Sequence, residues 1–355
     1  MFEAQRNKNM GRTWSPKLKF AIALGAGGVL AAVITGVILG TRSARHYPEY
    51  RPMHYSLLTT YEGESFFDGF DYYHGPDPTK GFVRYVDGAD AASRNLTYAG
   101  PSSAVIRVDA TGQLASSRSP VGRRSVRLHS KTNYSEGLFI FDVLHSPYGC
   151  GTWPAIWLTD PSNWPMNGEI DIMEATNTAM TGNQVTLHTS QGCTMDVERK
   201  ETGTPLLTEC YGARNNNAGC GVKGDVDTYG AVFNENGGGV YAMELRSDGI
   251  RIWFFPRHHI PTNINASTTL DPSSWGTPLA DFPGTKCDIK SHFKNLKIII
   301  NIDLCGQLGG EPRYYNDESG CPGTCTDFVA RNPSNFTTAF WEIGSIKIYH
   351  GEGCC

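Results

Sequence analysis

Three carboxylates stand close together at residues 167–174, in the otherwise apolar sequence NGEIDIME. Ionised carboxylates are rarely buried without a partner, because removing their charge from water is costly. Acid/base chemistry would explain them, since one carboxylate can act as a nucleophile while another donates a proton. A solvated acidic strand, or an edge that binds a cation, is the competing interpretation.

The alternation of acids with apolar residues, opened by a glycine, predicts a strand. On a regular strand Glu169 and Asp171 share one face, whereas Glu174 points to the other. We therefore predict a β-bulge near residues 172–173, whose extra residue returns Glu174 to the face of the other two acids. The outer two acids would then form the pair that a retaining glycosidase holds roughly 5–5.5 Å apart.

The rest of the chain predicts many further strands. Runs of β-branched and aromatic residues, separated by Gly, Pro, Asn and Asp, occupy residues 104–108, 125–128, 137–143, 184–187, 240–245, 249–255, 296–302 and 344–349. Helical periodicity is absent outside residues 20–40. The pattern predicts an all-β, jelly-roll sandwich of two antiparallel sheets in one domain at residues 61–355.

Composition narrows the possible partners. The chain has 355 residues with 40 Gly and 20 Pro, and its formal charge is −4 at pH 7. The basic residues cluster only near the N-terminus, so we expect no nucleic-acid partner. Seven Trp and 16 Tyr suit a carbohydrate partner, although they suit a β-rich core equally well. We expect a monomer without a cofactor.

The N-terminus predicts a membrane anchor. Residues 20–40 carry no charge, and these 21 residues are enough to cross a bilayer as a helix. Basic residues are in excess on the N-terminal side of this segment. We expect a cytosolic tail at 1–19, a transmembrane signal-anchor at 20–40 and a stem at 41–60. The protein would then be a single-pass type II membrane protein with a lumenal or extracellular domain. A cleaved signal peptide, which would release the domain, is the alternative.

Two other features agree with export. Sequons for N-glycosylation occur at Asn95, Asn133, Asn265 and Asn335. All ten Cys follow residue 40, and their even number predicts disulfides whose connectivity the sequence leaves open. Zinc is an alternative for the pair at 321 and 325. No second pair has metal-ligand spacing, so we expect no metal.

The sequence GTWPAIW at 151–157, followed by NGEIDIME at 167–174, resembles glycoside hydrolase family 16. The nearest group is the fungal laminarinase-like endo-β-1,3(4)-glucanases. The supporting stretches are residues 66–70, 81–87, 122–127, 301–306 and 339–343, so that the resemblance covers nearly all of 61–350. It implies a concanavalin A-like jelly roll with a cleft across its concave sheet, and retaining hydrolysis of β-glucan.

The resemblance also implies roles for individual residues. Glu169 matches the nucleophile, Glu174 the general acid/base and Asp171 the residue between them. The nucleophile must stay ionised while the acid holds a proton, so their surroundings must push the two pKa values apart. The six-residue spacing matches the laminarinase-like branch, because the related transglycosylases carry a shorter motif without a bulge.

Four further residues are candidates for binding the sugar. Trp157 and Trp164 match aromatic residues of the cleft, although Trp157 could equally belong to the core. His188 matches a histidine of the site, although a lone His is more often structural. Trp275 lies in a turn-like sequence and is a candidate for a further subsite.

Alternatives of function remain open. After residues 301–306 the family commonly continues with an aromatic residue, whereas this chain continues with QLGG at 307–310, which leaves the preferred glucan open. A cell-wall transglycosylase would use the same carboxylates. A non-catalytic glucan-binding lectin could share the fold, but it would have no use for the acid/base pair. The leading prediction is a membrane-anchored enzyme that hydrolyses β-1,3 or mixed β-1,3/1,4-glucan.

Overall fold

The computed structural model describes residues 15–16, 47–115, 121–266 and 269–351. The chain divides into two units, 1–46 and 47–355, and the fold below is that of the second unit. The expected signal-anchor at 20–40 and nearly all of the expected cytosolic tail lie outside the described residues. Within the described residues, no helix combines the length and apolar character needed to cross a membrane.

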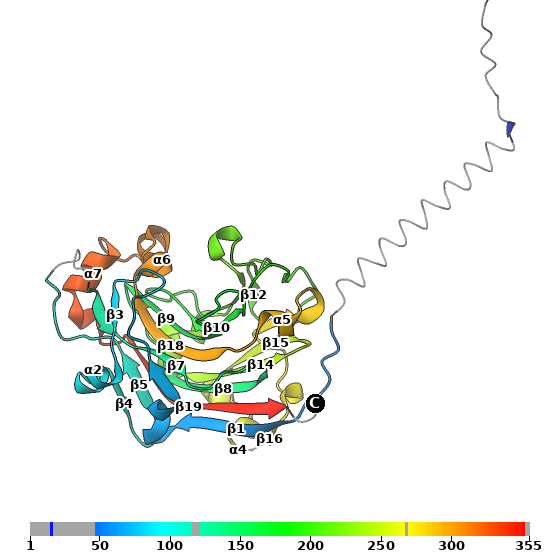
Figure 1. The fold of residues 1–355 in the computed structure, drawn as a ribbon, viewed down its shortest axis with the longest axis horizontal. Coiled ribbons are helices and arrows are strands. Elements are labelled where there is room, and N and C mark those ends of the chain that lie inside the picture. Colours follow the sequence, from blue (N-terminus) through cyan, green and yellow to red (C-terminus); the bar gives the residue numbers. More distant parts are fainter. Residues whose placement is uncertain (1–14, 17–46, 116–120, 267–268, 352–355) are drawn as a thin grey trace, which may run out of the picture. The chain divides into compact units, whose positions relative to one another are not determined.

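Two antiparallel sheets stack to form the domain (Figure 1). The strands of the first, sheet A, are β1 (Tyr55–Glu62), β4 (Thr97–Ala99), β5 (Ala104–Arg107), β8 (Gly137–His145), β14 (Gly239–Arg246), β15 (Gly249–Pro256), β16 (Thr269–Leu270), β17 (Ala280–Pro283) and β19 (Phe340–Gly351). Their main order is β16-β1-β19-β8-β14-β15-β17, and β5 pairs with both β19 and β4.

The second sheet, sheet B, carries the acidic segment. Its strands are β2 (Phe70–Tyr72), β7 (Arg127–Ser130), β9 (Thr152–Thr159), β10 (Glu169–Glu174), β11 (Gln184–His188), β12 (Thr204–Pro205), β13 (Cys220–Lys223) and β18 (Lys297–Leu304). Their order is β12-β13-β11-β10-β9-β18-β7-β2, which places β10 near the middle. A short parallel pair joins β3 (Val83–Tyr85) to β6 (Arg123–Ser125). The predicted antiparallel sandwich is confirmed.

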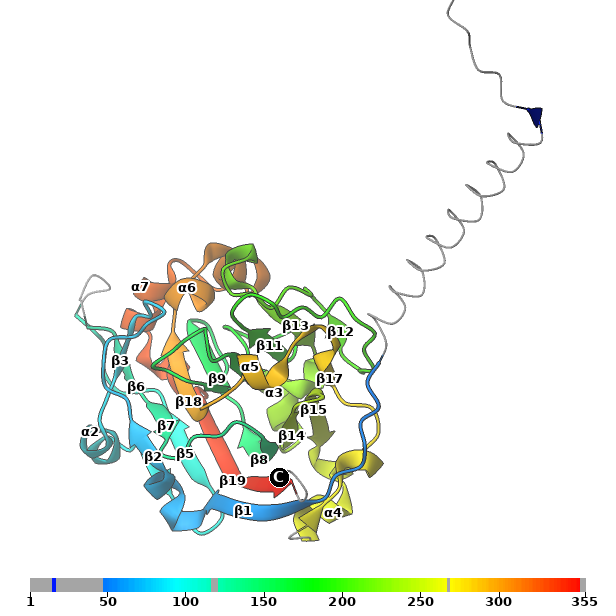
Figure 2. The ribbon, with the colours of Figure 1, turned by 45° about the vertical axis from the view of Figure 1, so that its right-hand side comes forward.

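Helices in the described chain are short and occupy connections. They are α2 (Gly88–Ser93), α3 (Gly230–Glu235), α4 (Thr262–Ala266), α5 (Ile289–His292), α6 (Gly306–Gly309) and α7 (Cys325–Arg331). Among the single turns of 3₁₀ helix are η3 (Val226–Thr228) and η5 (Pro272–Ser274). Two views place α6 and α7 near each other at one end of the sandwich (Figures 1 and 2).

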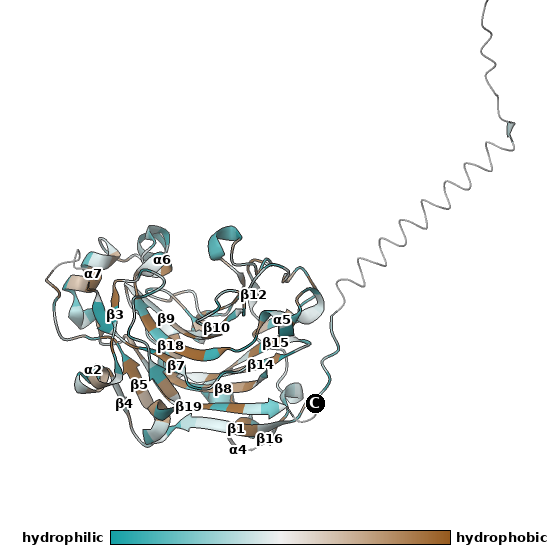
Figure 3. Ribbon diagram, viewed as in Figure 1, coloured by the Kyte–Doolittle hydropathy of each residue, from teal (hydrophilic) through white to brown (hydrophobic). Residues whose placement is uncertain are grey.

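The core fills the space between the sheets. Leu158 of β9 and Ile170 of β10 pack in one apolar cluster with Phe139 and Phe141 of β8, and all four side chains are fully buried. Strands of both sheets accordingly carry apolar stretches (Figure 3). Each such side chain contributes about 1.5–3 kcal/mol when it leaves water. Because this face of sheet B packs in the core, its opposite face points away from sheet A.

A second apolar cluster lies on the other face of sheet A, and it contains Trp275. Leu138 and Ile140 of β8 belong to this cluster, whereas Phe139 between them faces the main core. The Trp275 ring meets the Trp253 ring edge-on at 5.5 Å. The turn of Trp275 folds back onto the face of sheet A that points away from sheet B, so the structure does not bring this residue, predicted to add a sugar subsite, to the acids.

The domain also begins earlier than residue 61. Strand β1 starts at Tyr55 and pairs with β19 from Tyr55 to Glu62. Upstream of it, the Tyr50 hydroxyl donates a hydrogen bond to Asp281 at 3.2 Å, and the Arg251 guanidinium lies 4.2 Å from the Tyr50 ring centre. The expected stem at 41–60 is thus too long, since residues 47–60 belong to the folded unit.

Four disulfides confirm the prediction from the cysteine count. They are Cys150–Cys321, Cys193–Cys287, Cys210–Cys220 and Cys305–Cys325. Cys321 and Cys325 bind different partners, so the zinc alternative for this pair is excluded by their bonding. The two terminal cysteines lie outside the described residues.

Replacing Cys150 and Cys321 together by Ala is expected to lower the free energy of unfolding by about 2–5 kcal/mol. The reason is that this bond joins residues 171 apart, so that its loss frees a long loop in the unfolded chain. The paired replacement of Cys210 and Cys220, which are 10 apart, should have the smaller effect. Chemical denaturation measures both, and equal losses would contradict the entropic account.

Candidate active site

Strand β10 contains the predicted bulge. Its pairing with β9 runs Asp171 to Trp157 and then Met173 to Ile156, so that Ile172 has no partner of its own. Ile172 and Met173 are both fully buried in the core. Two successive side chains therefore point inward, and Glu174 emerges on the same face as Glu169 and Asp171. The bulge prediction is confirmed.

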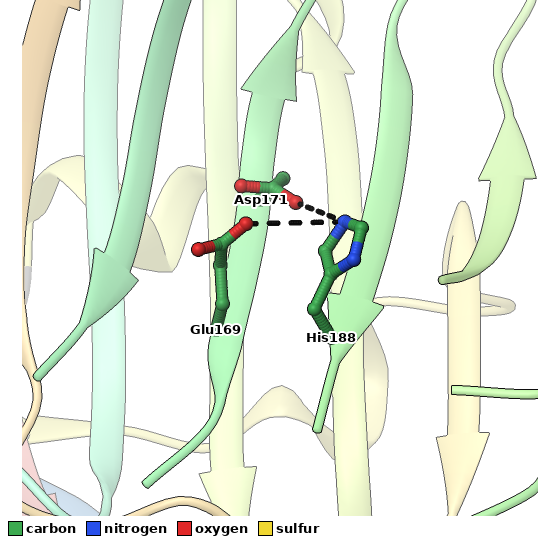
Figure 4. Close-up of side chains that lie close together, drawn as sticks. All are labelled: Glu169, Asp171 and His188. Atoms are coloured by element: carbon green, nitrogen blue, oxygen red, sulfur yellow. Dashed lines mark ion pairs between the residues drawn. The ribbon is translucent and has the colours of Figure 1, made fainter. Parts of the chain in front are cut away.

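His188 joins Glu169 and Asp171 from the neighbouring strand (Figure 4). It lies directly opposite Glu169 in the pairing of β11 with β10. Its Nε2 lies 3.4 Å from Asp171 Oδ2 and 3.8 Å from Glu169 Oε1. Its Nδ1 lies 3.2 Å from Asn217 Oδ1, which fixes the ring from the other side. The structure thus brings this predicted residue into contact with the acids.

Each outer acid receives a hydrogen bond from a different indole. Trp164 Nε1 donates to Glu169 Oε2 at 2.5 Å, and Trp153 Nε1 donates to Glu174 Oε1 at 2.8 Å. Trp164 was predicted to flank the site, and 46% of it is exposed to solvent. Trp153 was not predicted. Its place four residues before Trp157 was the available signal, because strand residues an even number apart share a face.

Trp157 lies opposite Asp171 and so belongs to the acid-bearing face. Its indole donates to Asn301 Oδ1 of β18 at 2.7 Å. The Arg127 guanidinium lies between two rings, 5.1 Å from the ring centre of Trp157 and 5.2 Å from that of Tyr73. The face therefore continues from the acids across β9, β18 and β7 as a surface of aromatic rings and one cation, which suits the stacking of a polar ligand with flat apolar faces.

Burial raises the pKa of both outer acids, but their surroundings differ. For Glu169 the nearby charge of His188 and the hydrogen bond from Trp164 oppose the rise in pKa. For Glu174 the hydrogen bond from Trp153 and the charge of His188 oppose the rise in pKa, whereas the charge of Glu169 adds to it. His188 thus lowers the pKa of both outer acids, but only the pKa of Glu174 is raised by the other outer acid, so an ionised Glu169 favours a protonated Glu174.

Asp171 and His188 each change the pKa of the other. Burial, reinforced by the charges of Glu169 and Glu174, raises the pKa of Asp171 well above its usual value. Burial alone would lower the pKa of His188, but its hydrogen bond to Asp171 and the three carboxylates raise the pKa to about 9. His188 is therefore a cation at neutral pH, and it neutralises part of the acidic charge that the face carries.

Glu169, Asp171 and His188 also offer donor atoms within 4.8 Å of one another, as a metal ion would require, and no other such group occurs among the described residues. Protonation of His188 competes with metal binding, because a ring nitrogen must lose its proton before it can coordinate an ion. The contact of His188 Nε2 with Asp171 also brings these donor atoms together.

The chain is similar to carbohydrate-active proteins along most of its length. A family model described as "XgeA-like, catalytic GH16 domain" matches residues 70–349. A probable glycosidase of Schizosaccharomyces pombe is 47% identical over 307 residues, covering 85% of this chain and 71% of that protein. A probable endo-1,3(4)-beta-glucanase of Aspergillus fumigatus is 42% identical over 305 residues, covering 83% of this chain and 45% of that protein.

A solved structure is also similar to this chain. GH16 laminarinase 16A from Phanerochaete chrysosporium, with β-glucans in both donor and acceptor sites, has a TM-score of 0.81 and 44% identity, and the match covers 84% of this chain and all of that one. An all-β sandwich with acids on one face of a central strand defines a class of glycoside hydrolases. The chain belongs to glycoside hydrolase family 16, and it is an enzyme of that family.

The pKa of His188 provides a test of the site's electrostatics. Asp171→Asn is expected to lower this pKa from about 9 by roughly one pH unit or more, because the variant removes the hydrogen bond and a charge. The pKa of His188 in the folded protein exceeds the ordinary 6.5. Its interaction with Asp171 therefore stabilises the fold fully below pH 6.5, and this stabilisation is lost as the pH rises through about 9. Titration of the imidazole by NMR measures the pKa. The distant His145 is the internal control. An unchanged pKa of His188 would contradict the assignment of Asp171 as its partner.

Proposed function

We propose that this protein is a retaining endo-β-1,3(4)-glucanase, in which Glu169 is the nucleophile and Glu174 the general acid/base. The observation that carries the proposal is the bulge in β10, which gathers three acids on one face. Each outer acid has its own indole donor. The supporting likeness is to the probable endo-1,3(4)-beta-glucanase and to the laminarinase with bound β-glucans.

The proposed mechanism follows from the different surroundings of Glu169 and Glu174. Glu169 attacks the anomeric carbon while Glu174 protonates the departing glycosidic oxygen, which yields a covalent glycosyl-enzyme and a shortened glucan. Glu174, now a carboxylate, takes a proton from water, and the resulting hydroxide displaces Glu169 with a second inversion. The His188 cation stabilises Glu169 whenever it is ionised, and Asp171 holds His188 in place. The two inversions together retain the β configuration.

The aromatic surface supplies the binding energy. Trp157 and Trp164 both precede the acids in the chain. Trp157 lies opposite Asp171 and Trp164 donates to Glu169, and we assign both to stacking on glucose rings. A face that carries aromatic residues on several strands suits the interior of a polymer, which is why we propose endo action. Transglycosylation is the second candidate, because the similar laminarinase binds β-glucans in an acceptor site as well as in a donor site. An acceptor sugar would then replace water. A lectin is disfavoured because it needs no acid/base pair.

We also propose that residues 20–40 anchor the protein with its N-terminus in the cytosol, as the charge pattern predicts. The four disulfides agree with export of the domain, because disulfides form in oxidising compartments. Three sequon asparagines, Asn95, Asn133 and Asn335, are exposed, so an oligosaccharide could be attached to each without disturbing the core. The side chain of Asn265 lies outside the described residues.

Incubation of the full chain with laminarin and with barley mixed-linkage glucan is expected to release short oligosaccharides whose new reducing ends are first β. Glu169→Gln should lower turnover by about 10⁴-fold or more, because no nucleophile of comparable reactivity replaces the carboxylate. The variant should still bind laminarin. NMR of the freshly released anomer and isothermal titration of binding measure these quantities.

Three results would decide against parts of this proposal. Release of the α anomer first would exclude retention, and unchanged turnover of Glu169→Gln would overturn the site assignment. Products longer than the added oligosaccharides would favour transglycosylation. Trp275→Phe serves as a control away from the cleft, and it should leave turnover unchanged.

The anchor has a separate test. The full chain is expected to stay with membranes during extraction at alkaline pH, because 21 uncharged residues favour the bilayer over water. A chain that starts at residue 47 behind a cleavable signal should be released into the medium. Release of the full chain in a shortened form would instead support a cleaved signal peptide.

A further inference from the structure

The bulge in β10 leaves two backbone groups without strand partners. Pairing with β11 ends at Asp171, opposite Thr186, and pairing with β9 shifts by one residue just beyond it. The carbonyl of Ile172 and the amide of Glu174 therefore lie beyond the ladder on the β11 side. A buried backbone group without a hydrogen bond costs about 1–3 kcal/mol, so the bulge requires a substitute partner.

The side chain of Asn183 is that partner. Its Oδ1 accepts a hydrogen bond from the Glu174 amide at 2.9 Å, and its Nδ2 donates to the Ile172 carbonyl at 2.8 Å. One carboxamide thus takes the place that a residue of β11 would hold in a regular ladder. Asn183 immediately precedes β11 and is completely buried.

Asn183 is itself held firmly. Its amide donates to Thr228 Oγ1 at 2.9 Å, and its carbonyl accepts from Gly224 at 2.9 Å. The preceding Gly182 has a φ of +81°, and a Cβ there would lie 2.1 Å from the carbonyl oxygen of Asp225. Only glycine fits so close an approach. The backbone therefore leaves the Asn183 side chain a single position, directed at the bulge.

We propose that Asn183 is a positioning residue for Glu174, and that it sets the direction of the acid/base carboxyl independently of the nucleophile. Glu169 is held by ladder pairs on both sides, Thr159 of β9 and His188 of β11. Glu174 has a ladder partner only on β9, and Asn183 replaces the other. Loss of the carboxamide therefore displaces the acid and leaves the nucleophile in place.

This inference rests on the proposed function, and it has a chemical signature. A displaced acid slows the departure of a sugar alcohol, which needs a proton, but hardly affects a leaving group that departs as a stable anion. General disruption of the fold would slow both departures alike. The comparison of two leaving groups thus separates a positioning role from a structural one.

The experiment compares Asn183→Ala with the wild-type full chain on laminarin and on 2,4-dinitrophenyl β-laminaribioside. The value of kcat/KM, which reports the first chemical step, is expected to fall about 10²-fold on laminarin. It should fall less than about threefold on the aryl glycoside. Equal losses on the two substrates, or no loss on laminarin, would overturn the proposal.

A second variant and a matched control complete the test. Asn183→Asp keeps the acceptor for the Glu174 amide and loses the donor to Ile172. Its kcat/KM should again fall on laminarin and not on the aryl glycoside, but by less than in Asn183→Ala. This variant replaces Asn183→Ala in the test if the latter does not fold. Asn234 bridges the amide and carbonyl of Ser146 at 2.8 and 3.0 Å, away from the acids. Asn234→Ala should leave both kcat/KM values unchanged.

Hydrogen exchange tests the contact without activity. The Glu174 amide should exchange slowly in the wild type and much faster in Asn183→Ala, while the amide of Ile170 stays protected. Unchanged exchange at Glu174 would overturn the role of Asn183. If the wild type cleaves the aryl glycoside but not laminarin, the proposed substrate fails, and the exchange result still decides the positioning role.

Discussion

One extra residue in the central strand of sheet B governs this active site. Side chains on a strand alternate, so without the bulge Glu174 would point into the core between the sheets. A lone carboxylate there would be forced to stay neutral. Because Ile172 and Met173 both turn inward, the acid returns to the open face beside Glu169 and Asp171. The indole donor of Glu174 and the carboxamide that closes the ladder gap are both consequences of that insertion.

The same face concentrates charge that a fold would otherwise avoid. Glu169, Asp171 and His188 bring polar atoms within 4.8 Å of one another, and Glu174 shares their face. Burial shifts the pKa of each acid upward. The raised pKa of His188 shows how the cluster is balanced, since the protonated ring is the nearest cation to two of the acids. Such an arrangement is unfavourable for stability and useful for catalysis. The sandwich core and the four disulfides supply the stability that the site itself does not.

Much of this could be predicted from local patterns. The strands follow from β-branched runs, and the bulge follows from the spacing of the three acids, because alternation is a local rule. The place of Trp275 could not be predicted, because a turn sequence does not say which face of a sheet it will cover. The spacing of Trp153 to Trp157 indicates its face of the strand, but its bond to Glu174 and the contacts of Asn183 depend on the register of β9 and β11 against β10, which no local pattern contains. The cysteine pairing likewise depends on distances across the fold.

The central claim is that Glu169 is the nucleophile of a retaining reaction, and trapping the intermediate tests it directly. A 2-fluoro-substituted β-laminaribiosyl fluoride should form the glycosyl-enzyme quickly and release it slowly, because fluorine destabilises the oxocarbenium-like transition state while fluoride leaves readily. Mass spectrometry of the digested protein should then find one sugar on the peptide that contains Glu169, with fragmentation placing it on that residue. A sugar on Asp171 or Glu174, or turnover without any adduct, would contradict the account.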